Sequence, residues 1–131
     1  MKTTLLCAAF LTSLSSAAFA DGHGSTFQQT CSNYAFAYLG TDAGITATCL
    51  KSDGTPNETS ITINGISNED GHLTNSGGGS TFQQSCGSIQ IKPSGPNAVI
   101  LHATCRMADG QSLSTSIELG GISNNDGVLT Q

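Results

Sequence analysis

One octapeptide occurs twice in this chain. GSTFQQTC at residues 24–31 returns as GSTFQQSC at residues 79–86, with seven of its eight residues identical. The similarity continues downstream, where GISNEDGHLT at 65–74 matches GISNNDGVLT at 121–130. Such self-similarity predicts two copies of one structural unit that pack against each other. The copies span approximately residues 24–75 and 79–131.

Both copies show the alternation of polar and apolar side chains that is typical of β-strands. The alternating runs are ITATC at 45–49, SITI at 60–63, VILHATC at 99–105 and LSTSIEL at 113–119. Four Asp-Gly pairs, which begin at residues 53, 70, 109 and 126, are typical turn formers between strands. We therefore expect an all-β fold, with at most a short helical turn after Phe27 and after Phe82.

Neither copy is expected to fold alone. A unit of about fifty residues with few large apolar side chains cannot close a core, so the two copies should share one. We expect Phe27 and Phe82 to anchor that core of a single domain, residues 21–131. The glycine-rich segment 76–79 is expected as a hinge between the copies. A passive linker and an exchange of copies between two chains are both open for it.

The first twenty residues have the features of a secretory signal peptide. Lys2 precedes the apolar run LLCAAFLTSL, and Ala-Phe-Ala at 18–20 has the pattern of a signal-peptidase site. The expected product is a secreted, extracellular protein.

Four cysteines remain after removal of this segment. An even number in a small exported protein favours disulfides over metal or redox chemistry. Pairs Cys31–Cys49 and Cys86–Cys105 would respect the repeat and close loops of similar length. Pairing across the copies is an alternative that would break the symmetry.

The charge balance excludes several classes of partner. Without Lys2, only Lys51, Lys92 and Arg106 oppose nine Asp and Glu residues. Nucleic-acid binding depends on phosphate contacts from Lys and Arg, and anionic membranes also attract basic segments, so neither partner is expected. The chain has no Trp, so polar groups should hold any ligand. No cofactor is expected.

Several motifs recur in the same order in both copies. F-x-x-[ST]-C spans Phe27–Cys31 and Phe82–Cys86, and N-x-D-G-x-L spans 68–73 and 124–129. With the second cysteine and S-I-x-[IL] between them, these motifs resemble the cyanovirin-N homologue family across residues 24–131. The resemblance implies two pseudo-symmetric halves, each a three-stranded sheet plus a β-hairpin, with segments exchanged between the repeats. It also implies disulfides within each repeat.

The resemblance further implies a lectin that binds terminal α1,2-linked mannose of high-mannose glycans, without catalysis or a required metal. Each of two sites would combine the start of one repeat, the turn after its second cysteine and the end of the other repeat. The first site would consist of Thr26, Gln29, Thr30, Ser52, Asp53, Asn124 and Asp126. The second would consist of Asn68, Asp70, Gln84, Ser85, Arg106 and Asp109. Amides, hydroxyls and carboxylates suit sugar hydroxyls, which both donate and accept hydrogen bonds.

Departures from the family pattern make the second site the weaker one. Met107, Ala108 and Gly110 stand where the type member of the family has polar side chains. Near the first site, Leu50 replaces a glutamate. An alternative function is a secreted structural, interaction or effector protein that kept the scaffold and lost sugar binding.

Further expectations concern single residues and the hinge. Asp70 and Asp126 precede glycine and could serve only as turn formers. They belong to different sites, so they do not form the carboxylate pair of a glycosidase. Asn57 begins the only N-x-[ST] sequon and is a possible N-glycosylation site. The hinge is longer than in the type member of the family and lacks the proline found there. This difference predicts a mainly monomeric protein, with a domain-swapped dimer as the alternative.

Overall fold

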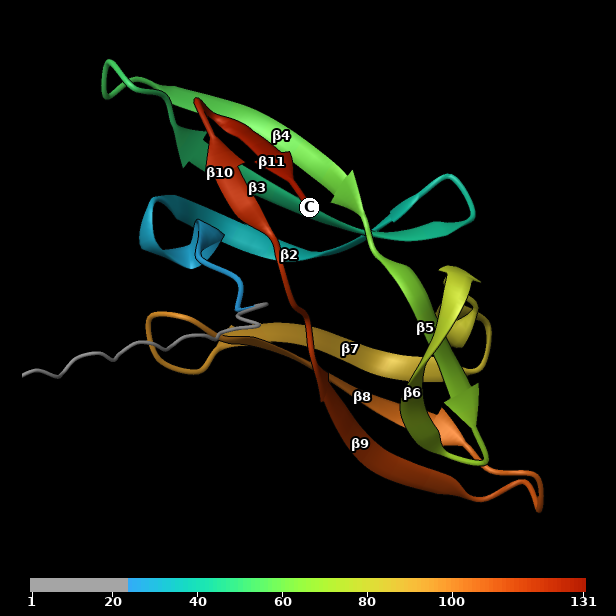
Figure 1. Ribbon diagram of the computed structural model, residues 1–131. Coiled ribbons are helices and arrows are strands. Elements are labelled where there is room, and N and C mark those ends of the chain that lie inside the picture. Colours follow the sequence, from blue (N-terminus) through green and yellow to red (C-terminus); the bar gives the residue numbers. More distant parts are fainter. Residues whose placement is uncertain (1–23) are drawn as a thin grey trace, which may run out of the picture.

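The computed structural model describes residues 24–131, and the predicted signal peptide lies outside them. These described residues form β-strands and two short 3-10 helices, labelled η (Figure 1). The first repeat contains η2 (Phe27–Gln29), β2 (Cys31–Leu39), β3 (Asp42–Leu50), β4 (Pro56–Thr62), β5 (Asn64–Glu69) and β6 (His72–Gly79). The second contains η3 (Phe82–Gln84), β7 (Cys86–Pro93), β8 (Val99–Arg106), β9 (Ser112–Glu118), β10 (Ser123–Asn125) and β11 (Val128–Thr130). In residues 24–131, no helix is long and apolar enough to cross a membrane.

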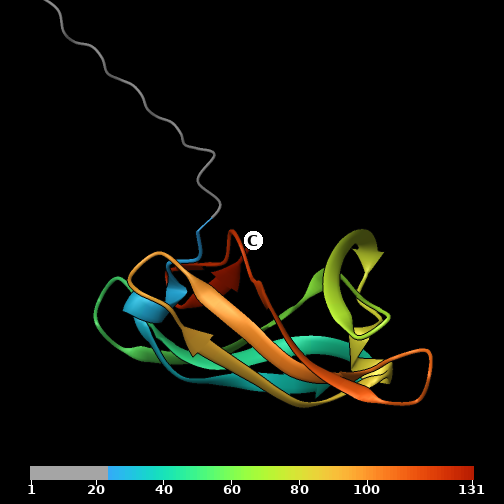
Figure 2. The same cartoon turned by 90° about the horizontal axis from the view of Figure 1, so that it is seen from below.

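Each repeat supplies a three-stranded antiparallel sheet and a two-stranded hairpin. The sheets have the strand orders β2-β3-β4 and β7-β8-β9, and the hairpins are β5-β6 and β10-β11. The hairpins lie at opposite ends of the molecule, as the view from below shows (Figure 2). This architecture confirms the all-β fold expected from the sequence.

The hairpins are exchanged between the repeats. The β10-β11 hairpin packs on β4 of the first repeat, and β6 packs on β9 of the second (Figure 1). The main-chain N–H of Leu129 donates to Thr59 Oγ1 at 3.2 Å, and that of Leu73 donates to Thr115 Oγ1 at 3.1 Å. The exchange that the resemblance implied is therefore present.

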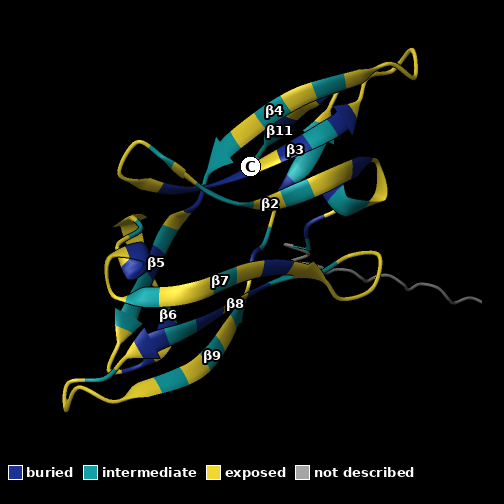
Figure 3. Cartoon of the chain, turned by 180° about the vertical axis from the view of Figure 1, so that it is seen from behind, coloured by how far each residue is buried: buried dark blue, intermediate teal, exposed yellow. Residues whose placement is uncertain are grey.

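One core joins the two halves. Phe27, Ile45, Phe82 and Leu101 are fully buried within a single cluster of apolar side chains from both repeats. The central strands β3 and β8 each contribute four residues to this core, whereas the outer strands β4 and β9 alternate between exposed and half-buried residues (Figure 3). The two repeats share one core, as expected.

The repeated octapeptide joins each sheet to its exchanged hairpin. Ser25 Oγ donates to the carbonyl of Leu119 and accepts from the N–H of Ile122. Thr26 N–H also donates to Ile122 O at 2.9 Å. The second copy repeats the arrangement, because Ser80 Oγ accepts from the N–H of Ile66 at 3.0 Å.

The first glutamine of each octapeptide reaches the opposite repeat. Gln28 Nε2 donates to Pro96 O at 3.0 Å, in the loop between β7 and β8. Gln83 Nε2 donates to Thr41 O at 3.1 Å, in the turn between β2 and β3. The two glutamines form a reciprocal clamp between the halves, which explains why the sequence repeats them.

Both disulfides lie within repeats. Cys31 pairs with Cys49, and Cys86 pairs with Cys105, each at directly opposed positions of neighbouring strands. The pairing that the repeat symmetry favoured is confirmed. The glycine-rich segment 76–79 differs from expectation, because it is the end of strand β6 and not a hinge outside any element. Gly79 pairs with Asn64 beyond a register shift.

Candidate functional site

The first predicted site is centred on the side chain of Asn124, at the start of the exchanged hairpin β10-β11. Asn124 Nδ2 donates to Thr30 Oγ1 and to Leu50 O, both at 2.9 Å, and its Oδ1 accepts from the N–H of Gly127 at 2.7 Å. Both amide hydrogens and the carbonyl oxygen are engaged. Asn124 therefore ties the hairpin to the octapeptide and to the turn after Cys49.

Asp126 makes the second connection between the hairpin and that turn. Its Oδ1 accepts from the N–H of Ser52 at 2.8 Å. The main-chain N–H of Ser52, followed by its side chain, holds the pKa of Asp126 below the usual value, and the nearby Lys51 ammonium acts in the same direction. The Ser52 contacts stabilise the ionised carboxylate, so Asp126 is charged at neutral pH.

The hairpin turn approaches the first repeat closely at Gly127. Asp126 and Gly127 have positive φ of 52° and 87°, as a tight Asp-Gly turn requires. A Cβ at Gly127 would lie 2.8 Å from Lys51 Cγ, so only glycine allows this contact. The Asp-Gly pair predicts a turn, and this turn also holds Asp126 against Ser52.

These contacts border an open cleft of about 340 Å³. Four predicted residues line it together, and Leu50, Lys51 and Gly54, which the prediction of the site did not include, complete it. The four predicted residues are Thr30, Ser52, Asn124 and Asp126.

Three other predicted residues of the first site do not line this cleft. Gln29 Nε2 donates to Pro96 O at 2.6 Å, toward the opposite repeat. Thr26 is the N-cap residue of η2, and its main-chain N–H donates to Ile122 O. Asp53 Oδ1 accepts from the hydroxyl of Thr55 at 2.6 Å and from its N–H, and these bonds, the hydroxyl first, lower the pKa of Asp53.

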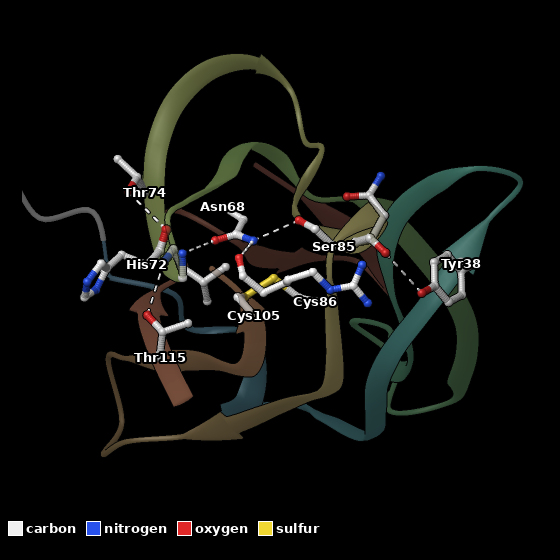
Figure 4. The surroundings of a disulfide bond; sticks show 12 residues. Tyr38, Asn68, His72, Thr74, Ser85, Cys86, Cys105 and Thr115 are labelled. Atoms are coloured by element: carbon white, nitrogen blue, oxygen red, sulfur yellow. Dashed lines mark hydrogen bonds between the residues drawn. A yellow bond between two sulfur atoms is a disulfide. The ribbon is translucent and has the colours of Figure 1, made fainter. Parts of the chain in front are cut away.

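The second site repeats the first around the other disulfide. Asn68 Nδ2 donates to Ser85 Oγ and to Arg106 O, both at 2.9 Å, and its Oδ1 accepts from the N–H of Gly71 at 2.7 Å. Figure 4 shows the Asn68 side chain next to the Cys86–Cys105 disulfide, with its hydrogen bond to Ser85. The position of Asn68 matches that of Asn124, so the repeat symmetry extends to single hydrogen bonds.

The second site differs in the side chains around this frame. Asp70 accepts from the N–H of Ala108 at 2.8 Å, where the first site has a serine, and Met107 replaces Lys51. Asp109 only accepts from the N–H of Gln111 within its own turn. Gln84, Ser85 and Arg106 line a hollow of about 360 Å³ that opens onto the sheet. The second site therefore offers fewer polar side chains along its turn.

Asn57, the possible glycosylation site, lies beneath the C-terminal hairpin. It is half-buried, and its Nδ2 donates to Gly127 O at 2.8 Å. Glycosylation of Asn57 stays a prediction. Among residues 24–131, no group of three His, Cys, Asp or Glu side chains could hold a metal ion.

A sequence profile of the CVNH domain matches residues 27–130, nearly the whole described chain. The chain belongs to the CVNH family. A search of curated proteins found no match.

Solved CVNH structures share the fold. NcCVNH of N. crassa is 23% identical with a TM-score of 0.62, over 80% of this chain and 96% of that one. Microvirin, solved in complex with mannobiose, is 32% identical with a TM-score of 0.58, over 81% of this chain and 97% of microvirin. A variant of MoCVNH3, solved in complex with (N-GlcNAc)4, is 16% identical with a TM-score of 0.61, over 83% of this chain and 98% of that one.

Proposed function

We propose that this protein is a secreted lectin that binds terminal α1,2-linked mannose of high-mannose glycans, mainly in the first cleft. Membership of the CVNH family and the sugar complexes of its relatives support carbohydrate binding without catalysis. The narrower proposal, that the sugar is mannose, is supported by the similarity to microvirin, a protein solved in complex with mannobiose.

The groups left free in the first cleft suit a sugar. The hydroxyl of Thr30 accepts from Asn124 and keeps its own proton to donate. Asp126 uses one carboxylate oxygen for Ser52, and the other remains an acceptor. The side-chain amide of Asn124 already makes hydrogen bonds within the protein, so its role is to position Thr30 and the hairpin.

The same chemistry gives selectivity between sugars. An epimer moves one hydroxyl away from its partner, and leaving a desolvated polar group unpaired costs about 1–3 kcal/mol. A single cleft therefore discriminates between sugars but binds one sugar only weakly. Two clefts on one rigid body can gain roughly 10² to 10⁴ in avidity on a branched glycan.

Titration calorimetry of the oxidised protein with α1,2-linked mannobiose tests this function. We expect binding that Thr30→Val together with Asp126→Asn weakens by about tenfold or more, since about 1.4 kcal/mol corresponds to tenfold. The matched control is Ser85→Ala together with Asp70→Asn in the second site, with a loss below about threefold. Equal losses in the two variants would contradict the preference for the first cleft.

A second candidate function is a scaffold that has lost sugar binding. The observation in its favour is that Asn124 and Asn68 spend their side chains on internal bonds that hold the fold together. Absence of binding to every mannose-terminated glycan on an array would select this function.

Export and a mainly monomeric state are part of the proposal. Fusion of residues 1–20 to a reporter should direct it into the medium of a secreting host. Light scattering after size exclusion should give the mass of one chain, and a stable dimer would contradict the monomer.

A further inference from the structure

A separate hollow of about 450 Å³ lies on the sheet β2-β3-β4, outside the residues predicted for either site. Its volume falls in the usual range of about 300–1,000 Å³ for small-ligand sites. Thr46 stands opposite Ser60, and Thr48 stands opposite Glu58, so two strands present a polar surface. Asn33 from β2, Ala47 and Thr59 also line it. We call this hollow the sheet groove.

A β-bulge shapes the sheet groove. The register of β2 against β3 shifts between Ser32 and Ala35, and Asn33 at the bulge has a positive φ of 54°. Bulges re-aim side chains and occur next to functional sites. A left-handed backbone at an asparagine is an uncommon conformation, of the kind that clusters at such sites.

Strand β4 divides its polar side chains between two tasks. Asn57 and Thr59 hold the exchanged hairpin, through Gly127 O at 2.8 Å and the N–H of Leu129 at 3.2 Å. Glu58 and Ser60 alternate with them, point to the opposite face and are exposed to solvent. Of the groove residues on β4, Thr59 therefore serves the fold, whereas Glu58 and Ser60 present their side chains to solvent.

The sheet groove adjoins the first cleft. Thr46, Thr48 and Leu50 share one face of β3, because alternate residues of a strand do so, and Leu50 lines the first cleft. At about 3.3 Å per residue, Thr46 lies roughly 13 Å along the strand from Leu50.

The second repeat shows the two surfaces joined. There a single hollow runs from the predicted site residues Gln84, Ser85 and Arg106 to Ser88 and Thr104. Ser88 has a positive φ of 50° at the equivalent bulge, and Thr104 is the equivalent of Thr48. The bulge surface therefore borders the predicted site in both halves of the molecule.

We propose that the sheet groove is an additional sugar subsite, which holds an inner residue of an oligosaccharide whose terminal mannose occupies the first cleft. This inference rests on the proposed function. Hydroxyls and an amide both donate and accept, and Glu58 only accepts, which suits the hydroxyls of a neutral sugar. The same carboxylate and the net negative charge of the chain disfavour an acidic glycan. The protein therefore prefers a linear oligosaccharide to the disaccharide.

The test compares two probes on one variant. Titration calorimetry measures α1,2-linked mannobiose and the linear mannotetraose on Thr46→Val/Thr48→Val/Ser60→Ala, which removes three hydroxyls and keeps side-chain shape. We expect unchanged affinity for mannobiose and about tenfold weaker affinity for mannotetraose, as the loss of surface hydrogen bonds to a ligand predicts. The matched control is Ser114→Ala/Ser116→Ala on the equivalent strand face of β9, which should change neither affinity.

The outcomes separate this proposal from the proposed function. Unchanged mannotetraose affinity, or equal affinity of the wild type for both probes, would overturn the subsite and leave the lectin function intact. Absence of mannobiose binding by the wild type would overturn both. Amide shifts at Asn33 and Thr48 that appear with mannotetraose and not with mannobiose would support the subsite without any mutation.

Discussion

Replacement of Asn124 by alanine tests the hydrogen bonds that join the C-terminal hairpin to the first repeat. The substitution removes the bonds to Thr30 Oγ1, Leu50 O and the N–H of Gly127. Each hydrogen bond contributes about 0.5–1.5 kcal/mol net, and exposed ones lie near the lower value. We therefore expect a loss of about 2 kcal/mol in the free energy of unfolding.

In a domain of about 100 residues, that loss corresponds to a fall of roughly 8–12 °C in Tm. Denaturant unfolding of the oxidised protein, followed by circular dichroism, measures the free energy directly. Exchange of the Gly127 and Leu129 amide hydrogens should accelerate more than exchange in β8, because the hairpin detaches first. The affinity for mannobiose should also fall, because the hairpin that lines one side of the cleft is no longer held in place.

Asn68→Ala is the matched control, because Asn68 makes the same three bonds in the other half. It should lose similar stability and affect mannobiose binding much less. Asn124→Asp keeps the acceptor but loses both donors, so it should be at least as unstable as the alanine variant. An Asn124→Ala protein whose free energy of unfolding lies within about 0.5 kcal/mol of the wild type would refute this role of Asn124, because that is the usual effect of a neutral surface substitution.

Three further predictions concern acid, the hairpin turn and a disulfide. The folded pKa of Asp126 is lowered, so its contribution to stability is complete above the unfolded value of about 3.9 and disappears as the pH falls through the folded value. Denaturant midpoints between about pH 2 and 6 should therefore fall less for Asp126→Asn than for the wild type. Gly127→Ala should cost more than Gly54→Ala in thermal unfolding, because both have φ of 87° but only the first would meet side chains, at 2.8 Å. Replacing Cys86 and Cys105 by serine should cost about 3 kcal/mol in denaturant unfolding, and a loss below about 1 kcal/mol would contradict the loop-closure estimate.

Strands with one buried face were predictable from the sequence. The run at 99–105 alternates strictly because Val99, Leu101 and Ala103 enter the core, and it lies within β8. Strand β2 was not recognised, because the bulge at Asn33 interrupts its alternation. The end of strand β6 was predicted as a hinge, because three consecutive glycines are typical of a linker, although Gly79 pairs with Asn64.

The candidate site was predictable where the repeat and the family motifs pointed to it. Thr30, Ser52 and Asn124 meet in one cleft as expected. Gln29 does not line this cleft, and its hydrogen bond to Pro96 O was not predictable, because Pro96 lies in a loop of the other repeat that no local pattern connects to it. Lys51 lines the cleft but was not among the residues predicted for the site, although it lies beside Ser52 in the same turn.

The repeated octapeptide has two structural tasks, and it contributes one residue to each proposed site. Its serine and its first glutamine join the halves, and its phenylalanine fills the core. Its seventh residue, Thr30 or Ser85, receives the hydrogen bond from the hairpin asparagine at the edge of a cleft. The duplication therefore preserves the contacts between the two repeats, and these contacts position the groups proposed for sugar binding.

The central claim is that the first cleft, built from both repeats, binds mannose. A titration of ¹⁵N-labelled protein with α1,2-linked mannobiose, followed by NMR, tests it most directly. We predict that the amides of Thr30, Ser52 and Asp126 shift at lower sugar concentration than those of Ser85, Arg106 and Asp70. Shifts confined to the second site, or none up to high millimolar sugar, would contradict the claim.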